Sequence, residues 1–424
     1  MSKPASRALQ VAAVAAGNAL EFYDFIIYST FAIFIGRAYF PAGGPVVSLL
    51  LALATFGIGF VTRPIGGVVL GRIGDRIGRK PAMLIAFALM AVGTLAVTFT
   101  PTWRQIGIAA PIIVIIARLI QGFALGGEYG PSTAYLVESA EPGRRGLIGS
   151  MQGVGQNLAA LTAALVALSL SLALSKSDLQ AWGWRAAFGL GLLIVPFGLI
   201  VRRRIEETAP AREQGPAAGG PFPWRLALVS ATILAGGTMI TYTGHYLSTF
   251  AMDSLHLPPS AAFGIGVTGG ACAVIFVPLG GWLSDRYGRR AIMIPGAAIA
   301  ALLVIPAYGV IVRHPSLLAI YAAVVVVGIP GNLAGGALYT AITESFPARM
   351  RCTAVGTVYA LTIAGFGGTT QFLVAALVHG TGQPMMITYY RFVAGLIFLA
   401  GVLALPESAP GKIRASLRPE AALA

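Results

Sequence analysis

The residues in this chain whose chemistry stands out are acids inside a long apolar stretch near its start. Glu21, Asp24 and Tyr28 lie at helical spacing in the stretch 11–36, so they share one face of a helix. An ionised carboxylate in apolar surroundings is costly unless it is paired, and acids in such positions indicate proton transfer or ligand binding. We expect Asp24, close to the middle of the stretch, to be the main proton carrier, with Glu21 as the alternative.

A second polar stripe contains the cation that we expect to partner these acids. Arg118, Gln121 and Glu128 share one face of the stretch 107–137, and Arg118 lies at a depth similar to that of Asp24. An arginine beside Asp24 keeps that acid ionised, and an arginine drawn toward a bound anion leaves the acid free to take up a proton. The alternative is a static buried ion pair that only fixes helix packing. Glu128 is either a further proton carrier or a structural acid near the end of its helix.

Amide, hydroxyl and imidazole side chains in the apolar stretches are candidates for substrate binding. His245, in the run YTGHY, is the only histidine well inside such a stretch, and both a binding and a packing role stay open for it. Amides bond to neighbouring helices as readily as to ligands. The candidates are Tyr28, Arg118, Gln121, Gln152, Gln156, Asn157, Tyr242, His245, Asn332 and Tyr339, with Tyr246, Tyr359 and Gln371 as further inward positions.

The composition shows that membrane-spanning helices must position these residues. Of 424 residues, 56% are apolar and 10% are charged, and the mean hydropathy is +0.79. Soluble domains have roughly 25% charged residues, so a water-soluble fold is excluded. A span needs about 20 apolar residues. Twelve such stretches occur, near 11–36, 46–70, 82–101, 107–137, 146–174, 185–201, 226–250, 260–282, 291–312, 316–343, 352–378 and 385–405.

The basic residues are distributed unevenly among the connections between spans. The chain has 29 Lys and Arg against 15 Asp and Glu, a formal net charge of +14. With the N-terminus inside the cell, 21 of the 29 fall on the cytoplasmic side, six on the outer side and two, Arg63 and Arg118, within spans. This asymmetry predicts that both termini are cytoplasmic. We therefore interpret the basic charge as a consequence of membrane topology and of contact with anionic lipid headgroups, and not as a nucleic-acid binding surface.

Other sequence features argue against an enzyme or a metalloprotein. Cys272 and Cys352 lie far apart with no metal-binding spacing around them. The string Gly264 to Gly269 fits GxGxxG but lies in an apolar span, without the strand and turn of a nucleotide site. We expect no enzymatic activity, no metal and no cofactor other than protons as the coupling ion. The start of the chain, interrupted by acids, is a first span rather than a signal peptide.

A loop sequence occurs twice at corresponding positions of two halves. GRIGDRIGRK at 71–80 recurs as GWLSDRYGRR at 281–290, an offset of 210 residues, and each copy follows the second span of its half. This indicates a duplicated six-helix unit. We expect 1–202 to form the first bundle, 203–224 a cytoplasmic linker, and 225–424 the second bundle with a short tail.

The repeated loops are predicted to act as conformational latches. Asp75 and Asp285 can accept hydrogen bonds from a helix N-terminus or pair with arginine, and such contacts can form in one conformation and break in another. The alternative is that the basic residues only anchor the topology. A second pair of motifs, at spacing seven, joins Glu138 to Arg145 and Glu344 to Arg351. The predicted latch residues are Gly71, Asp75, Arg76, Arg79, Asp285, Arg286, Arg289, Glu138, Arg145, Glu344 and Arg351.

The repeated loop resembles the signature G-x-x-x-D-R-x-G-R-[RK] of the major facilitator superfamily. GNALEFYDF at 17–25, RLIQGFALGGEYG at 118–130 and TESFPARMR at 343–351 are similar to its metabolite:proton symporters, which include citrate, α-ketoglutarate, shikimate and proline/betaine carriers. The resemblance covers all twelve spans. It implies an all-α membrane protein of two pseudo-symmetric six-helix bundles, with spans one and four facing a central cavity. Related sugar:proton symporters have an Asp and an Arg at the positions of Asp24 and Arg118.

We therefore expect a proton-coupled symporter of the bacterial inner membrane that imports a small organic anion by alternating access. Citrate or a related tri- or dicarboxylate is the preferred substrate, because Arg118 and nearby amides and hydroxyls suit carboxylate oxygens and the span-seven region resembles that of citrate carriers. Proton coupling is expected because a multiply charged anion would be repelled from an acid-rich cavity unless protons came with it. The alternatives are a proton symporter of betaine or proline, whose cation Tyr23, Tyr242 and Tyr246 could hold, and a non-transporting sensor. The expected partners are the substrate, protons and membrane lipid, and the expected functional unit is a monomer.

Overall fold

The structure is a computed structural model that describes most of the chain. The described residues are 19, 22–41, 43–76, 79–127, 129, 132–133, 136–137, 140–141, 143–192, 222–313, 316–347, 351–409 and 412. For residues 71, 72, 74–76, 79–83, 312 and 351–353 only the backbone is described. Three predicted acids and most of the predicted linker lie outside the described residues; the acids are Glu21, Glu128 and Glu138. Of the predicted latch residues, only the backbone is described for Gly71, Asp75, Arg76, Arg79 and Arg351.

The N-terminal half is built from helices over its whole described length. Helical residues 22–30 lead into α2, and residues 184–192 close the half after a short π-helical turn, Leu179–Gly183. The other helices are α2 (Ala32–Tyr39), α3 (Pro45–Ile58), α4 (Arg63–Arg76), α5 (Arg79–Phe99), α6 (Trp103–Ile106), α7 (Ala109–Gly126), α9 (Arg145–Ala173) and α10 (Lys176–Asp178).

The described residues of the C-terminal half form six long helices. Local sequence explains several starts: Pro259 occupies the first turn of α13, and the Ser316 hydroxyl accepts the Ala319 N–H ahead of α15. The helices are α12 (Trp224–Asp253), α13 (Pro259–Tyr287), α14 (Arg289–Arg313), α15 (Leu317–Ser345), α16 (Arg351–Thr381) and α17 (Met386–Ala404).

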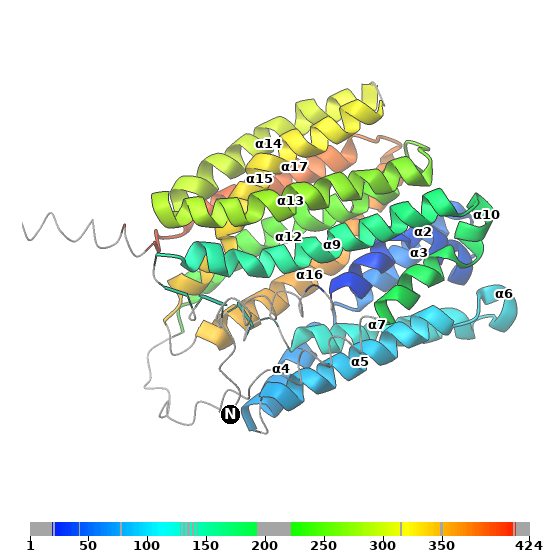
Figure 1. Ribbon diagram of the computed structural model, residues 1–424, viewed down its shortest axis with the longest axis horizontal. Helices are drawn as coiled ribbons and strands as arrows, with labels where there is room; N and C mark the ends of the chain where they lie inside the picture. The colour runs from blue at the N-terminus through cyan, green and yellow to red at the C-terminus, as the bar shows by residue number, and fades with distance from the viewer. Residues whose placement is uncertain are drawn as a thin grey trace, which may run out of the picture.

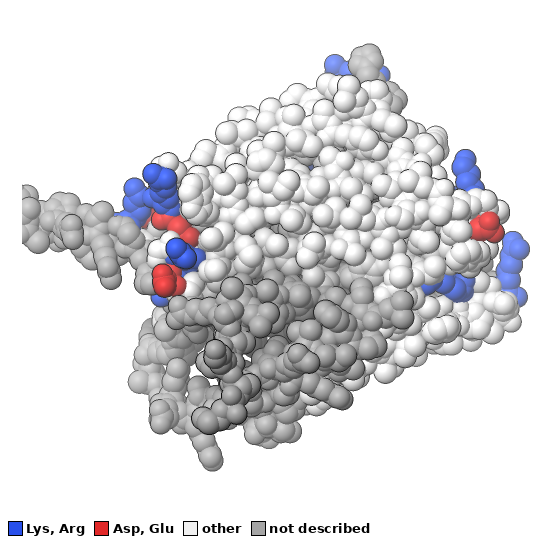
Figure 2. Space-filling model, in the orientation of Figure 1, with Lys and Arg blue, Asp and Glu red and all other residues white. Residues whose placement is uncertain are grey.

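The predicted spans agree with these helices. Each of the twelve coincides with helical residues of the described chain. Nine helical stretches among the described residues are long and apolar enough to cross a membrane. Figure 2 shows the matching surface, where charged side chains gather at the two ends of the molecule and the visible belt between them is uncharged. Large apolar residues are exposed on the described helices, among them Phe99, Leu172, Leu302 and Leu318, as expected for lipid contact.

The two halves lie against each other along two sets of helices. In Figure 1, α4, α5 and α7 of the N-terminal half occupy the lower part of the view and α13, α14 and α15 of the C-terminal half the upper part, with α9 and α16 between them. α9 packs along α13, and α16 packs against α3 and α4. These pairs hold together segments that are far apart in the sequence.

The second predicted span is broken rather than continuous. α3 ends at Ile58 and α4 begins at Arg63, and the turn between them has bonds three residues apart, such as Phe60 N–H to the Gly57 carbonyl at 3.0 Å. Pro64 has no N–H to donate to the carbonyl four residues earlier, which removes one bond of a regular helix at this position. The break places Arg63 at the start of α4.

Glycines allow α4 and α7 to pack at backbone contact. A side chain on Gly122 would collide with the carbonyl of Gly59, and one on Gly126 with the carbonyl of Arg63. Gly66 of α4 is held equally tightly against the carbonyl of Phe123. Gly122 and Gly126 are four residues apart on one face of α7, and small residues at this spacing permit such a close approach.

Candidate functional site

Asp24 occupies a tight, buried position between three helical segments. It is 4% exposed, and its Oδ2 accepts a hydrogen bond of 2.5 Å from Thr94 Oγ1 on α5. Its Oδ1 has no hydrogen-bond partner among the described residues. Gly191, in the helical residues 184–192, lies against Oδ1, and a side chain at that position would collide with the carboxylate. The acid thus has one satisfied oxygen and one oxygen that can take a proton.

Arg118 is joined to Asp24 by a chain of two intervening side chains. Its Nη1 donates to Gln121 Oε1 at 2.6 Å, and Gln121 Nε2 donates to Thr94 Oγ1 at 3.1 Å. Thr94 completes the chain to Asp24. The described contacts contain no direct ion pair between the acid and the arginine. The sequence placed both ends of this chain at one depth but missed Thr94, the residue that connects them.

Aromatic rings surround the Arg118 guanidinium. The side chain is 1% exposed, and its guanidinium carbon lies 4.0 Å from the ring centre of Tyr28 and 4.9 Å from that of Phe25. Its Nε and Nη2 have no hydrogen-bond partner in the described part of the chain. Cation–π contact offsets part of the cost of burying the charge.

Arg63 is a second buried cation, to which the sequence analysis gave no role. It is 2% exposed, and its guanidinium carbon lies 4.1 Å from the ring centre of Phe60 and 4.7 Å from that of Phe25. Its Nε and Nη2 likewise lack described hydrogen-bond partners. The signal that identified Arg118, an arginine inside an apolar span, applies equally to Arg63.

A cavity of about 200 Å³ lies between the two halves. Six predicted substrate-binding residues line it, and four do not. The lining includes Gln156, Asn157, Tyr242, His245, Asn332 and Tyr339. Tyr28, Arg118, Gln121 and Gln152 are not among the residues that line this cavity.

The first helix lines this cavity without its central acid, Asp24. Phe22 and Ile26 line the cavity, whereas Asp24, two residues from each, faces Thr94 on the other side of the helix. The first span thus faces the cavity, as the resemblance implies, but Asp24 does not line it. The physical reason is aromatic packing, because Phe25 lies 4.5 Å, centre to centre, from Phe56 inside the N-terminal bundle.

Arg391 is a cavity residue that was not among the predicted site residues. It lies near the start of the last predicted span, 385–405. In the structure it lines the cavity from α17, and its Nη1 donates to the Tyr308 hydroxyl at 2.9 Å. It is the only charged side chain among the cavity's described lining residues.

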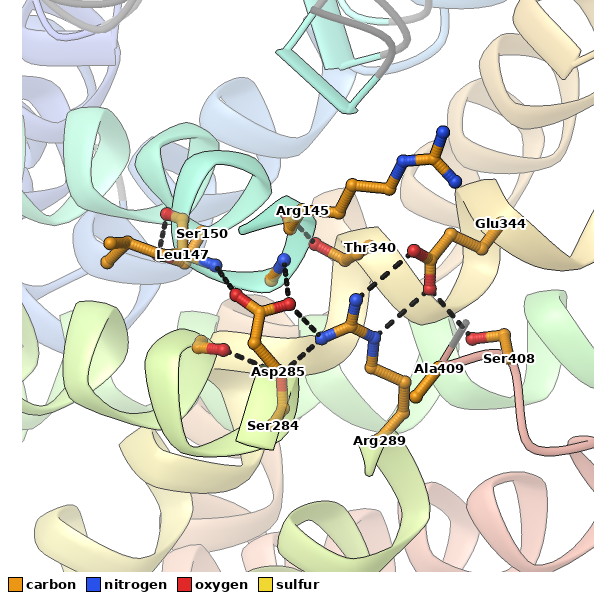
Figure 3. A network of polar contacts seen from close by, with 12 residues as sticks. Arg145, Leu147, Ser150, Ser284, Asp285, Arg289, Thr340, Glu344, Ser408 and Ala409 are labelled. Carbon is orange, nitrogen blue, oxygen red and sulfur yellow. Dashed lines mark hydrogen bonds and ion pairs between the residues drawn. The ribbon is translucent and has the colours of Figure 1, made fainter. Parts of the chain in front are cut away.

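The C-terminal copy of the repeated loop forms a polar network between the halves (Figure 3). Asp285 accepts the N–H groups of Gly146 and Leu147, at 2.7 and 2.9 Å, at the N-terminus of α9. Arg289 donates to Asp285 at 2.7 Å and to Glu344 at 3.0 and 3.1 Å. Asp285 thereby links α13 of one half to α9 of the other.

Other predicted latch residues differ in what they contribute. Arg145 supplies its backbone carbonyl to the Thr340 hydroxyl at 3.2 Å (Figure 3). Arg286 instead lies 5.8 Å from the ring centre of Tyr287. Glu407, which the sequence analysis did not single out, accepts the Arg289 N–H at 2.9 Å and so caps α14. That these contacts act as a latch stays a prediction.

The fold and the central cavity are those of a membrane transporter, and comparison with known proteins identifies the family. Residues 9–210 match the family "Sugar (and other) transporter", and residues 265–423 match "Major Facilitator Superfamily". A citrate-proton symporter of Klebsiella pneumoniae is 35% identical over 392 residues, which cover 90% of this chain and 88% of the relative. A proline/betaine transporter of Salmonella typhimurium is 30% identical over 423 residues, covering 94% of this chain and 83% of the relative.

The fold has a close counterpart among solved structures. The proton:xylose symporter XylE, bound to 6-bromo-6-deoxy-D-glucose, matches with a TM-score of 0.77 over 94% of this chain and 96% of the other, at 15% identity. This chain belongs to the major facilitator superfamily, and the resemblance to its metabolite:proton symporters is confirmed. It is a multi-pass membrane transporter and not an enzyme.

Proposed function

We propose that the protein is a proton-coupled symporter that imports a small organic anion, with citrate or a related di- or tricarboxylate as substrate. The observation that carries this proposal is the buried chain from Asp24 through Thr94 and Gln121 to Arg118. An acid and a cation held inside the membrane are expensive and indicate function. The citrate-proton symporter among the relatives supports the choice of substrate.

Charge balance provides the coupling. The described buried charges of the N-terminal half around Phe25 are two arginines, Arg63 and Arg118, and one acid, Asp24. Protonation of Asp24 removes the negative charge, and the excess positive charge then attracts an anion into the neighbouring cavity. An arriving anion in turn compensates for the neutralised acid. Proton and substrate therefore favour each other's binding, as linkage requires.

Aromatic rings connect the two buried arginines to the cavity, so the positive charge lies close to it. Tyr242 lines the cavity, and its ring centre lies 5.4 Å from that of Phe60 and 6.0 Å from that of Phe56. The guanidinium of Arg63 packs against the ring of Phe60, and the ring centre of Phe56 lies 5.5 Å from the Arg118 guanidinium carbon. In this mechanism Arg118 acts on the substrate through its electrostatic attraction and not through direct contact. The prediction that it contacts the substrate directly stays open for another conformation.

Alternating access supplies the movement. We place both termini and the Asp285 network on the cytoplasmic side of a bacterial inner membrane, as the positive-inside rule predicts. The two bundles, 1–202 and 225–424, would then rock about the cavity as a monomer, with the network closing the cytoplasmic end in the conformation described here.

A zwitterionic osmolyte is the second candidate substrate. A proline/betaine transporter is among the relatives, and Tyr242, Tyr339 and Tyr359 line the cavity with aromatic surface that suits a quaternary ammonium.

Transport by the purified protein in proteoliposomes tests the proposal. With an inward proton gradient we expect uptake of labelled citrate or a dicarboxylate, and collapse of the gradient by a protonophore should stop accumulation. Uptake of betaine without any carboxylate would reverse the order of the two candidates. Absence of counterflow exchange for both classes would favour a non-transporting sensor.

A further inference from the structure

Part of the cavity lies inside the C-terminal bundle rather than at the contact between the halves. Ala297, Ala300 and Ala301 of α14 line it, together with Arg391 and Gly395 of α17. These small residues leave room beside the guanidinium. At about 200 Å³ the cavity is smaller than the ~300–1,000 Å³ of sites for drug-sized ligands, which suits a small organic acid.

The charge of this cavity has one sign among its described lining. Arg391 is the only charged side chain there, and no Asp or Glu lines the cavity within the described residues. Its hydrogen bond to the Tyr308 hydroxyl uses one of five guanidinium donors. No ion pair between Arg391 and a described acid occurs. A cation in a membrane-embedded cavity without an acid is costly, and a bound anion would relieve that cost.

The position of the guanidinium brings it close to other polar lining groups. Arg391 Nη1 lies 4.0 Å from where a Cβ on Gly244 of α12 would stand, beside His245, which lines the same cavity. Gln156 and Asn157 of α9 line the cavity from the other half. A ligand with two or more carboxylates could therefore bind the cation in one half and amide donors in the other.

We propose that Arg391, oriented by Tyr308, binds a carboxylate of the substrate and makes the C-terminal half the anion-binding half of the transporter. This inference rests on the proposed function and assigns its substrate site. Arg118, which lies outside the cavity lining, tunes proton binding in the N-terminal half. The guanidinium fork matches a carboxylate in bidentate geometry, which an ammonium group cannot do.

Equilibrium binding to the purified protein at fixed pH tests the assignment, with citrate, succinate and betaine as probes. We expect Arg391→Gln to weaken citrate binding by about tenfold or more and Arg391→Lys to weaken it less. Tyr308→Phe keeps the cation but removes its partner, and it should weaken citrate binding a few-fold. Arg313→Gln, an exposed arginine at the end of α14, is the matched control and should bind citrate like wild type.

Several outcomes separate this inference from the proposed function. Wild-type citrate affinity in Arg391→Gln would overturn the Arg391 site while leaving symport intact. Should that variant fail to fold, unchanged affinity in both Arg391→Lys and Tyr308→Phe would overturn it equally. Betaine binding without carboxylate binding in the wild type would overturn both proposals. Citrate binding that depends on Arg391, combined with uptake that ignores a proton gradient, would support the site and refute the coupling.

Discussion

At the scale of single residues, the proposed mechanism depends on a few charges placed where charges are expensive. Asp24 and Arg118 were predictable because ionisable groups inside apolar spans are rare, and each one indicates a functional site. Thr94 was not predictable, because threonines in helices commonly bond to their own backbone, as Thr98 Oγ1 does to the Thr94 carbonyl at 2.7 Å. Arg391 was missed because it lies near the start of the last predicted span, where an arginine is ordinarily interpreted as an anchor at the membrane surface.

Asp24→Asn should abolish proton-driven accumulation of substrate. The amide cannot take up a proton, while its similar shape preserves the packing against Gly191 and Thr94. Counterflow exchange, which needs no net proton movement, should survive at a reduced rate. Uptake of labelled substrate with and without an imposed gradient measures both. Full gradient-driven accumulation in the variant would remove Asp24 from the mechanism.

Thr94→Val should impair coupling through loss of one hydroxyl. That hydroxyl links Asp24 to Gln121, and a hydrogen bond to a charged group contributes about 1.5–3 kcal/mol. We expect about a tenfold or larger fall in proton-driven uptake. Thr98→Val is the matched control, because its hydroxyl bonds only to a backbone carbonyl, and it should transport at near wild-type rates. Equal effects of the two substitutions would show that the linking role of Thr94 is wrong.

At the scale of elements, helix positions follow from apolar length, whereas helix partners do not. The twelve spans were predictable because each must cross about 30 Å of hydrocarbon. The break before Arg63 and the turn of Asp24 toward Thr94 could not be read from periodicity, because they depend on Pro64 and on the aromatic packing of Phe25 against Phe56. Glycines four residues apart in α7 permit a close approach by some helix, but only the fold shows that α4 is the partner.

Gly126→Ala should destabilise the protein, against the usual effect of adding a methyl group to a helix. The new Cβ would collide with the Arg63 carbonyl, and overpacking typically costs about 1–3 kcal/mol. Gly365→Ala in α16 is the control, since a Cβ there meets no atom within 4 Å. Removing a helical glycine at that position should leave stability unchanged or raise it slightly. Thermal unfolding in detergent compares them, and equal melting temperatures would contradict the tight α4–α7 contact.

At the scale of the whole molecule, the duplicated halves meet at a cavity and are joined at one end by a charged network. The duplication and its loop signature were visible in the sequence, because the copies lie at matching positions of each half. Which contacts form depends on the conformation. Asp285 bonds to α9 and to Arg289 here, and α9 and α13 must separate if that end is to open.

Asp285→Asn should shift the population toward conformations open at the network end. Removing one partner of a buried charge pair costs about 3–5 kcal/mol, and this cost falls only on the conformation in which the pair forms. Distances between spin labels on α9 and α13 at that end report the shift. Arg286→Gln is the control, because Arg286 takes no part in the described network, and its distance distribution should match wild type. An unchanged distribution in Asp285→Asn would refute the latch.

The central claim is that substrate and protons cross together by way of Asp24, and proton movement itself tests it most directly. Proteoliposomes that contain a pH-sensitive dye receive citrate outside, with no imposed proton gradient. We predict that the lumen acidifies as citrate enters through the wild-type protein. In Asp24→Asn we predict no acidification, although citrate exchange persists. Citrate entry through the wild type without acidification, or equal acidification in the variant, would contradict it.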